Sequence, residues 1–221
     1  MAHYDLEEQE QLAQIKHFWS RYGNLIASVL IVVFGGIAAF NGWNYWQRTQ
    51  ASKAAVLFDE VEKAAVAKDQ DRLDRSLNDI REQFGKTVPA AQAALLAAAT
   101  WADLGQTDKA KAALQWVVES SKDDAYQGIA RIRLAGLALE TQAWDDAQRW
   151  LNFAFPEALK PLAADRQGDV WALQGEADKA KASYQTAWET MDKATEYRRL
   201  VSVKLAALGV QVADDTAESR P

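Results

Sequence analysis

Two related phrases decide the fold that we expect for this chain: LGQTDKAKAALQWV at residues 104–117 and QGEADKAKASYQTA at residues 174–187. A looser copy, TQAWDDAQRWLNFA, occupies residues 141–154, and KDQDRLDRSLNDI at residues 68–80 extends the series upstream. Successive aligned copies lie 37, 37 and 33 residues apart. A period near 35 residues indicates repeated pairs of helices.

The residue types in the phrase have physical roles in a helix pair. Gly105 and Gly175 can end a helix in the left-handed conformation, because glycine has no Cβ to clash there. The aspartate three residues later can cap the next helix or favour its N-terminus electrostatically. One turn further, a small residue lets two helix backbones approach, and apolar side chains follow on the same face. These packing positions are Ala110, Leu114, Val117, Ala147, Leu151, Ala154, Ala180, Tyr184 and Ala187.

The chain after residue 50 carries few strand signals. Proline occurs there only at positions 89, 156, 161 and 221, Ala-rich apolar runs dominate, and alternating β-branched residues are scarce. We therefore expect an all-α domain over residues 51–209. Its last helix, EYRRLVSVKLAALG at residues 196–209, would cover the exposed final face of a solenoid. The acidic segment 210–221 is expected to be a disordered tail.

The phrases resemble the tetratricopeptide repeat, which has a period of about 34 residues. Two copies depart from that pattern, with Gln142 and Lys68 at the position of the turn glycine. The resemblance therefore implies a tetratricopeptide-like solenoid with irregular loops, and the alternative is an Ala-rich helical bundle with fortuitous similarity. The residues that match are Ala98, Trp101, Gly105, Ala110 and Leu114 in one copy and Gly168, Trp171, Gly175, Ala180 and Tyr184 in another.

A different stretch, NLIASVLIVVFGGIAAFNGWNYW at residues 24–46, contains no charged side chain. The 26 uncharged residues between Arg21 and Arg48 reach about 39 Å as a helix, more than the roughly 30 Å hydrocarbon core of a bilayer. A signal peptide needs only about 7 to 15 apolar residues. We therefore predict a membrane anchor over residues 22–47, not a cleaved signal or a core helix. The aromatic residues that border it, as at membrane interfaces, are Trp19, Tyr22, Trp43, Tyr45 and Trp46.

Small residues recur at four-residue spacing in this anchor. The pairs are Gly35 with Ala39 and Ala38 with Gly42, and they either contact another helix or merely tolerate lipid. Basic residues lie in similar number on both sides of the anchor, so charge does not decide its orientation. The short acidic segment 1–21 forms a tail before it.

The amino-acid composition argues against several kinds of partner and site. There are 25 Lys and Arg against 31 Asp and Glu, and no basic stripe stands out, which argues against nucleic acid as a partner. The chain has no Cys, and its two histidines, His3 and His17, precede the anchor. Nucleotide-binding and hydrolase motifs are absent from the sequence. We therefore predict no catalytic, cofactor, metal or small-molecule site.

The tryptophans of the large domain are candidates for core or for a protein-binding surface. Trp101 and Trp171 occupy repeat packing positions, which favours the core. Trp144 and Trp150 flank the turn and the helix of the most deviant copy. We therefore take Trp144 and Trp150 as candidate protein-binding residues.

The whole arrangement resembles the YfgM family of ancillary SecYEG translocon subunits. The most specific part is the tail motif EEQEQL followed by HFWSRYGN, joined to an anchor that ends in GWNYW. The resemblance implies a Gram-negative inner-membrane protein with a cytoplasmic N-terminus and a periplasmic repeat domain. It also implies association with SecYEG and with the periplasmic chaperone PpiD.

These features lead to a non-enzymatic hypothesis. A membrane-tethered adaptor would hold a protein-binding repeat domain beside the translocon and pass translocated chains to periplasmic chaperones. An alternative is a structural or stress-signalling regulator of the envelope, which binds another component through its repeat domain or its acidic tail. An enzyme would require acids and lysines brought together from different helices, which no motif in the sequence suggests.

Overall fold

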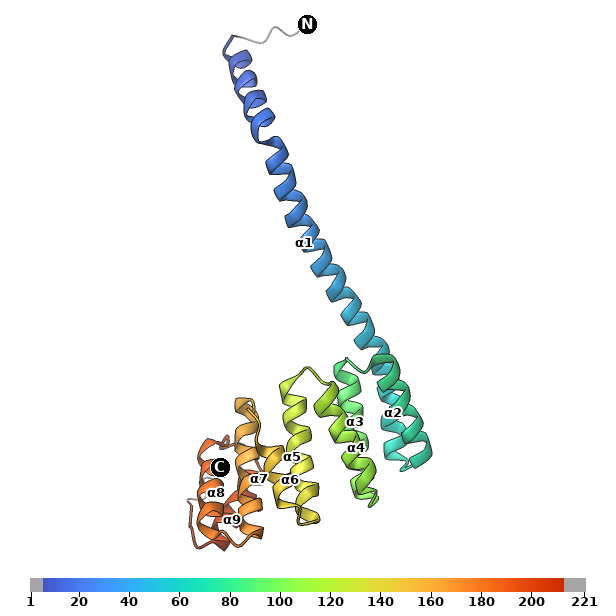
Figure 1. Ribbon diagram of the computed structural model, residues 1–221, viewed down its shortest axis with the longest axis vertical. Helices are drawn as coiled ribbons and strands as arrows, with labels where there is room; N and C mark the ends of the chain where they lie inside the picture. Colours follow the sequence, from blue (N-terminus) through green and yellow to red (C-terminus); the bar gives the residue numbers. More distant parts are fainter. Residues whose placement is uncertain (1–5, 213–221) are drawn as a thin grey trace, which may run out of the picture. The chain divides into compact units, whose positions relative to one another are not determined.

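The computed structural model describes residues 6–212, with side chains from residue 10 onward, and every regular element in that range is a helix (Figure 1). The predicted all-α class is confirmed. The chain divides into two compact units, Met1–Gln50 and Ala51–Pro221. The elements are α1 (Leu6–Val66), α2 (Gln70–Phe84), α3 (Val88–Asp103), α4 (Thr107–Ser120), α5 (Asp124–Glu140), α6 (Trp144–Leu151), the 3-10 helix η1 (Glu157–Leu159), α7 (Lys160–Leu173), α8 (Ala177–Thr190) and α9 (Arg198–Ala207).

The first unit contains the apolar part of α1. Among the described residues, α1 is the one helix that is long and apolar enough to cross a membrane. Ile31 and Val32 are 72% and 74% exposed, although a helix in a soluble protein normally turns such side chains toward a core. Exposure of this whole stretch is what a membrane anchor requires. Helix α1 already begins at Leu6, within the segment that we expected to form the tail.

The second unit is a row of helix pairs. Each helix from α2 to α9 contacts the next one along the chain, and among the first helices of three pairs α5 contacts both α3 and α7. The end of α1 joins α2 through an ion pair in which Arg72 Nη2 lies 2.6 Å from Glu60 Oε2. Helix α9 follows the last pair. The expected series of helix pairs closed by one terminal helix is confirmed.

The first helix of each pair ends in a left-handed turn. Gly105 and Gly175 have φ angles of 71° and 78°, as the phrase predicts. Gln142 and Lys68 adopt the same conformation, at 56° and 52°, although they carry a Cβ. After each of these four residues, the next backbone N–H donates to the carbonyl five residues earlier, over 2.7 to 3.1 Å. The two deviant copies therefore keep the turn at a cost in strain.

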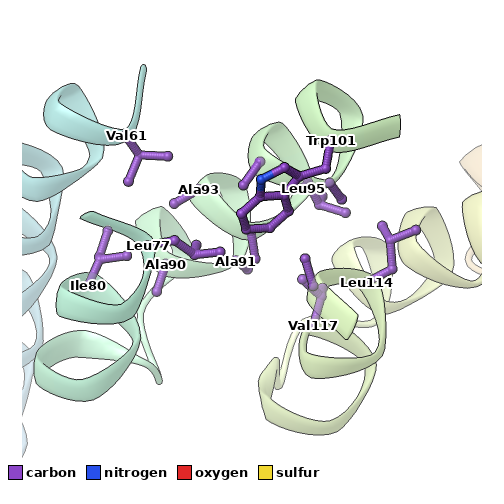
Figure 2. Close-up of a cluster of buried hydrophobic side chains, with 14 of the residues drawn as sticks. Val61, Leu77, Ile80, Ala90, Ala91, Ala93, Leu95, Trp101, Leu114 and Val117 are labelled. Carbon is purple, nitrogen blue, oxygen red and sulfur yellow. The ribbon is translucent and has the colours of Figure 1, made fainter. Parts of the chain in front are cut away.

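The aligned residues of the phrase form the contact between the two helices of a pair. Ala110, Ala147 and Ala180 are fully buried, and so is Leu73 at the same position of the earliest copy. Figure 2 shows how the following apolar residues of α2 and α4 meet the first helices of their pairs. The labelled residues of these two helices are Leu77, Ile80, Leu114 and Val117, and they belong to one buried cluster with Val61, Ala93, Leu95 and Trp101.

Residue size is matched across the helix pairs. Ala98 of α3 occupies the repeat position at which α7 has Gly168, and their partners on the second helices are Leu114 and Tyr184. A Cβ added at Gly168 would lie 2.4 Å from Tyr184 Cε1, far inside van der Waals contact. The larger partner therefore requires the smaller residue.

The third pair is irregular because its second helix is short. Helix α6 ends at Leu151, so Ala154, which we expected at a packing position, lies beyond the helix and is exposed. Phe155 is buried instead, and a Cβ on Gly128 of α5 would come within 2.7 Å of Leu159 Cδ1 and 3.2 Å of Phe155 Cδ1. The segment between α6 and α7 thus covers the surface that a longer α6 would have covered.

Helix α9 closes the row. Val201 and Leu205 are fully buried in a cluster with residues of α8, so α9 covers the last face of the repeats as predicted. Val210 and Val212 pack partly against the same cluster. They belong to the segment 210–221 that we expected to be disordered; the rest of that segment, 213–221, lies outside the described residues.

Candidate protein-binding groove

A groove of about 640 Å³ lies in the second unit, along the first helices of three successive pairs. Small and apolar side chains of α3, α5 and α7 make up most of its wall, and Leu173 remains 59% exposed there. The Ala-rich sequence of α3 helps to form the groove, because short side chains leave space between neighbouring helices. The main apolar lining residues are Ala98, Ala99, Ala102, Leu137, Ala172 and Leu173.

Helix α5 contributes two charged side chains to the groove, Arg133 and Glu140. Arg133 Nη1 donates a hydrogen bond of 2.9 Å to the backbone carbonyl of Leu95 on α3. Glu140, two turns further along α5, is exposed. Among the described residues, neither charge has an oppositely charged partner within 4.0 Å. Two unpaired charges of opposite sign therefore lie along one wall.

Arg166 of α7 adds a second guanidinium to the groove. It lies across Gly136 of α5, where an added Cβ would be 3.7 Å from Arg166 Cζ. Arg166 Nη1 donates to Asp169 Oδ2 over 3.0 Å, whereas its Nε is buried without a hydrogen-bond partner. Arg166 therefore lies against α5 at Gly136, at a distance that an alanine there would also allow.

A polar network closes the far end of the groove and joins α7, α8 and α9. Asp165 is only 1% exposed, and Lys204 Nζ donates to both of its carboxylate oxygens over 2.8 Å. Lys204 Nζ also donates to Asp169 Oδ1 over 2.7 Å. The phenolic O–H groups of Tyr197 and Tyr184 donate to Asp165 and Asp169 over 2.7 and 2.8 Å. Each carboxylate therefore accepts several hydrogen bonds.

The network favours the neutral form of its two tyrosines. Burial, reinforced by the hydrogen bond to Asp169, raises the pKa of Tyr184 above its ordinary value. Burial and the hydrogen bond to Asp165 raise the pKa of Tyr197 in the same way. Removing one member of such a buried set leaves the others without partners, which is more costly than never having the set. The arrangement is suited to holding three helices in register.

The repeat residues singled out in the sequence lie at the contacts within and between pairs. Trp101 is buried, while Trp171 is only half-buried, with Lys179 Nζ 4.7 Å from its ring centre. Trp144 and Trp150, the candidate binding residues, are both half-buried and pack against the cluster that α5, α6 and α7 share. Neither of these two tryptophans is among the residues lining the groove in the described part of the chain.

The anchor residues singled out in the sequence are exposed on α1. Trp43 and Trp46 contact each other, with ring centres 5.3 Å apart. A Cβ added at Gly35 or Gly42 would meet no atom within 4 Å, so these positions stay open in a single chain. Ala39, which lies between them on α1, is exposed as well.

Sequence reasoning did not identify the charged residues of the groove or its closing network. A signal was present: Asp165 and Asp169 are four residues apart on a helix that otherwise contributes small and apolar side chains to the core. Lys204 likewise lies between the buried Val201 and Leu205 on α9. Pairing of these acids with that lysine depends on where α9 packs, which spacing alone does not reveal. In the described part of the chain, no three His, Asp or Glu side chains are grouped closely enough to hold a metal ion.

Comparison with known proteins gives consistent results over nearly the whole chain. A family model described as a tetratricopeptide repeat-like domain matches residues 16–210. A protein of Neisseria gonorrhoeae (strain ATCC 700825 / FA 1090) named ancillary SecYEG translocon subunit is 33% identical over 92% of this chain and 98% of its own length. Proteins of the same name from Aggregatibacter actinomycetemcomitans and Escherichia coli (strain K12) are 28% and 27% identical, over 91% and 82% of this chain and 98% and 85% of their own lengths.

Proposed function

The chain belongs to the tetratricopeptide repeat-like family of ancillary SecYEG translocon subunits, and we propose that it acts as a non-enzymatic, membrane-anchored adaptor at the translocon. One observation carries the proposal. The similarity to the Neisseria gonorrhoeae subunit extends over 98% of that protein and so includes the apolar helix together with the repeats. A chain that was similar in its repeats alone would share only a common binding scaffold.

The anchor places the repeat domain at the inner membrane of the cell. We assign the segment before the anchor to the cytoplasm and the repeats to the periplasm, as the family resemblance implies. The exposed apolar surface of α1 between Trp19 and Trp46 supports insertion, since such a surface is unfavourable in water.

The repeat domain supplies the binding function. Its groove combines small apolar side chains with the unpaired charges of Arg133 and Glu140, a composition suited to polypeptide. The proposed partners are the SecYEG translocon and the periplasmic chaperone PpiD, with the adaptor linking newly translocated chains to periplasmic chaperones. Confinement to one membrane raises the effective concentration of such partners, so individual contacts can stay weak and reversible.

Photocrosslinking in intact membranes tests this function. A photoreactive residue replaces Leu173, which is 59% exposed in the groove, in the full-length chain at its native expression level. We expect crosslinks to a translocon subunit or to a periplasmic chaperone. The matched control places the same residue at Arg149 of α6, whose side chain is 68% exposed and lies outside the groove.

Two experimental results would contradict the adaptor function or favour its alternative. Recovery of neither translocon subunits nor chaperones from the groove position, together with failure to copurify them from detergent extracts, would contradict the adaptor function. The envelope-regulator alternative predicts that partners depend on the acidic tail instead. Deleting residues 2–15 distinguishes the two, because an adaptor that works through its repeats retains its partners without that segment.

A further inference from the structure

We propose that the groove binds a short, extended polypeptide segment that carries one acidic side chain among small apolar ones, with Arg133 and Arg166 as the residues that bind the acid. This inference rests on the adaptor function proposed above and specifies the peptide chemistry that its groove accepts. The evidence comes from the charge, the hydrogen bonds and the dimensions of the groove.

Arg133 is the first cation available to such a ligand. Its Nη1 donates to the carbonyl of Leu95, which fixes the guanidinium against α3 but neutralises none of its charge. Two exposed arginines elsewhere on this unit, Arg72 and Arg149, have a carboxylate partner, whereas the exposed Arg75 and Arg199 lie outside the groove and have none among the described residues. Arg133 lines a groove and has no carboxylate within 4.0 Å among the described residues. A ligand carboxylate would supply the missing partner.

Arg166 is the second cation, and its partner is shared. Asp169 accepts hydrogen bonds from Tyr184, Lys204 and Arg166, and Lys204 also pairs with Asp165, so two carboxylates serve two cations. Arg166 Nε is buried and has no acceptor, while 30% of the side chain remains exposed. The charge of Arg166 is therefore balanced within the network, and Arg166 can contribute to binding through the 30% of its side chain that is exposed at the groove.

Both guanidinium groups lie along the same part of α5. Gly136, over which Arg166 lies, follows Arg133 by three residues, which is less than one helical turn. Arg133 reaches from α5 toward α3, and Arg166 reaches from α7 toward α5. A carboxylate placed over this turn of α5 is thus attracted by the unpaired charge of Arg133 and lies beside the exposed part of the Arg166 guanidinium. Electrostatic attraction is stronger in such a partly enclosed site than on an open surface.

The dimensions of the groove favour an extended segment over a helix. A helix has a diameter of about 10 Å, and a cylinder of that width would fill the groove's volume of about 640 Å³ over a length of only about 8 Å. That is less than two helical turns, so the groove could enclose only a short piece of a helix. An extended chain advances about 3.3 Å per residue and places several side chains against the alanines of α3 and α7.

Glu140 makes the groove selective against ligands with a second acidic residue. It lies seven residues after Arg133 on the same helix, about 10 Å along the axis, and has no cation within 4.0 Å among the described residues. Its charge repels a second acid in the ligand, so the groove accepts an isolated acidic residue better than an acidic cluster. Removal of this charge should strengthen the binding of an acidic peptide.

A binding assay with two synthetic peptides tests the inference. The full-length chain is placed in nanodiscs of zwitterionic phosphatidylcholine and titrated into the peptide Ala-Ala-Leu-Glu-Ala-Ala. The peptide carries a fluorescein label, its termini are otherwise blocked, and binding is followed by fluorescence anisotropy. The Gln version of the peptide differs only in charge. We expect the Glu peptide to bind about tenfold more tightly, with the preference lost in Arg133→Gln and reduced in Arg166→Gln.

Two further variants distinguish an effect of charge on peptide binding from an effect of misfolding. Glu140→Gln should tighten binding of the Glu peptide severalfold, a gain that a misfolded protein would not show. Arg149→Gln removes the same charge outside the groove and should leave both affinities unchanged. Equal binding of the Glu and Gln peptides, binding of neither, or an equal loss in Arg133→Gln and Arg149→Gln would overturn the inference. The assay contains no translocon, so its failure is separate from a failure of the adaptor function, which crosslinking and copurification test.

Discussion

Gly168→Ala tests the size matching on which the repeat packing depends. The Cβ of alanine would lie 2.4 and 2.5 Å from Cε1 and Cδ1 of Tyr184 and 3.0 Å from its Cγ. Carbon atoms in contact are normally about 3.5 to 4.0 Å apart. The ring cannot turn away easily, because Tyr184 is buried and its hydroxyl donates to Asp169. Helix α7 or α8 must therefore move.

The expected magnitude follows from two opposing effects. Inserting a methyl group into a packed core typically costs about 1 to 3 kcal/mol, whereas alanine is favoured over glycine inside a helix by about 1 kcal/mol. Because the clash reaches Cγ, close to the backbone, we expect a net destabilisation of about 1 to 2 kcal/mol. Gly136→Ala is the matched control: its nearest contact is 3.7 Å, so only the helix preference acts and the chain should become about 1 kcal/mol more stable.

Urea unfolding of the full-length chain in detergent micelles, followed by tryptophan fluorescence, measures both variants. A difference of about 2 to 3 kcal/mol between them corresponds to a difference of about 1 to 1.5 M in the urea midpoint, for a slope of about 2 kcal/mol per M. Tyr184→Leu also removes the hydrogen bond to Asp169, so the clash is isolated by a double-mutant cycle: the double variant should lose less stability than the sum of Gly168→Ala and Tyr184→Leu. Equal midpoints for the two alanine variants, or strictly additive losses in the double variant, would refute the reasoning.

Three other results are expected. Lys68→Gly and Gln142→Gly should each raise the free energy of unfolding by about 0.5 to 1 kcal/mol, because glycine relieves the strain of a positive φ, and urea midpoints would show it. Because the pKa of Tyr184 is raised in the folded chain, its contribution to stability is complete below pH 10 and declines above it, where the unfolded chain loses the phenolic proton. Tyr184→Phe should therefore lose less stability than the unmodified chain between pH 9 and 11 in the same assay. Lys204→Met should cost about 3 to 5 kcal/mol, measured by thermal unfolding, because it leaves Asp165 buried without its cation.

The helix pairs were predictable because their determinants are local. A glycine at a helix end and a small residue one turn into the next helix act within a few residues, so Gly105 and Ala110 reveal the pair directly. The left-handed turn also forms where the glycine is missing. Gln142 keeps the left-handed turn because the hydrogen bonds that close it use only backbone atoms, and the strain is small beside the packing that follows.

The charged part of the groove was not predictable because its contacts are distant in sequence. Lys204 meets Asp165 across 39 residues, and Arg133 meets the Leu95 carbonyl across 38. Both separations are close to one repeat, so they follow from the register between neighbouring pairs. That register depends in turn on irregular features such as the short α6 and the segment that carries Phe155. A regular repeat model would therefore misplace the residues that give the groove its charge.

The proposed tether determines how strong binding in the groove has to be. A groove of about 640 Å³ contacts only a few residues of a ligand, and partly exposed ion pairs contribute about 1 kcal/mol or less each. We therefore expect dissociation constants for free peptides in the micromolar to millimolar range. Partners held on the same membrane reach effective concentrations near the millimolar range, so weak binding fills the groove while a partner is close and releases it afterwards. A nanomolar affinity for a short peptide would contradict this reasoning, because such a groove would stay occupied after the partner had left the membrane.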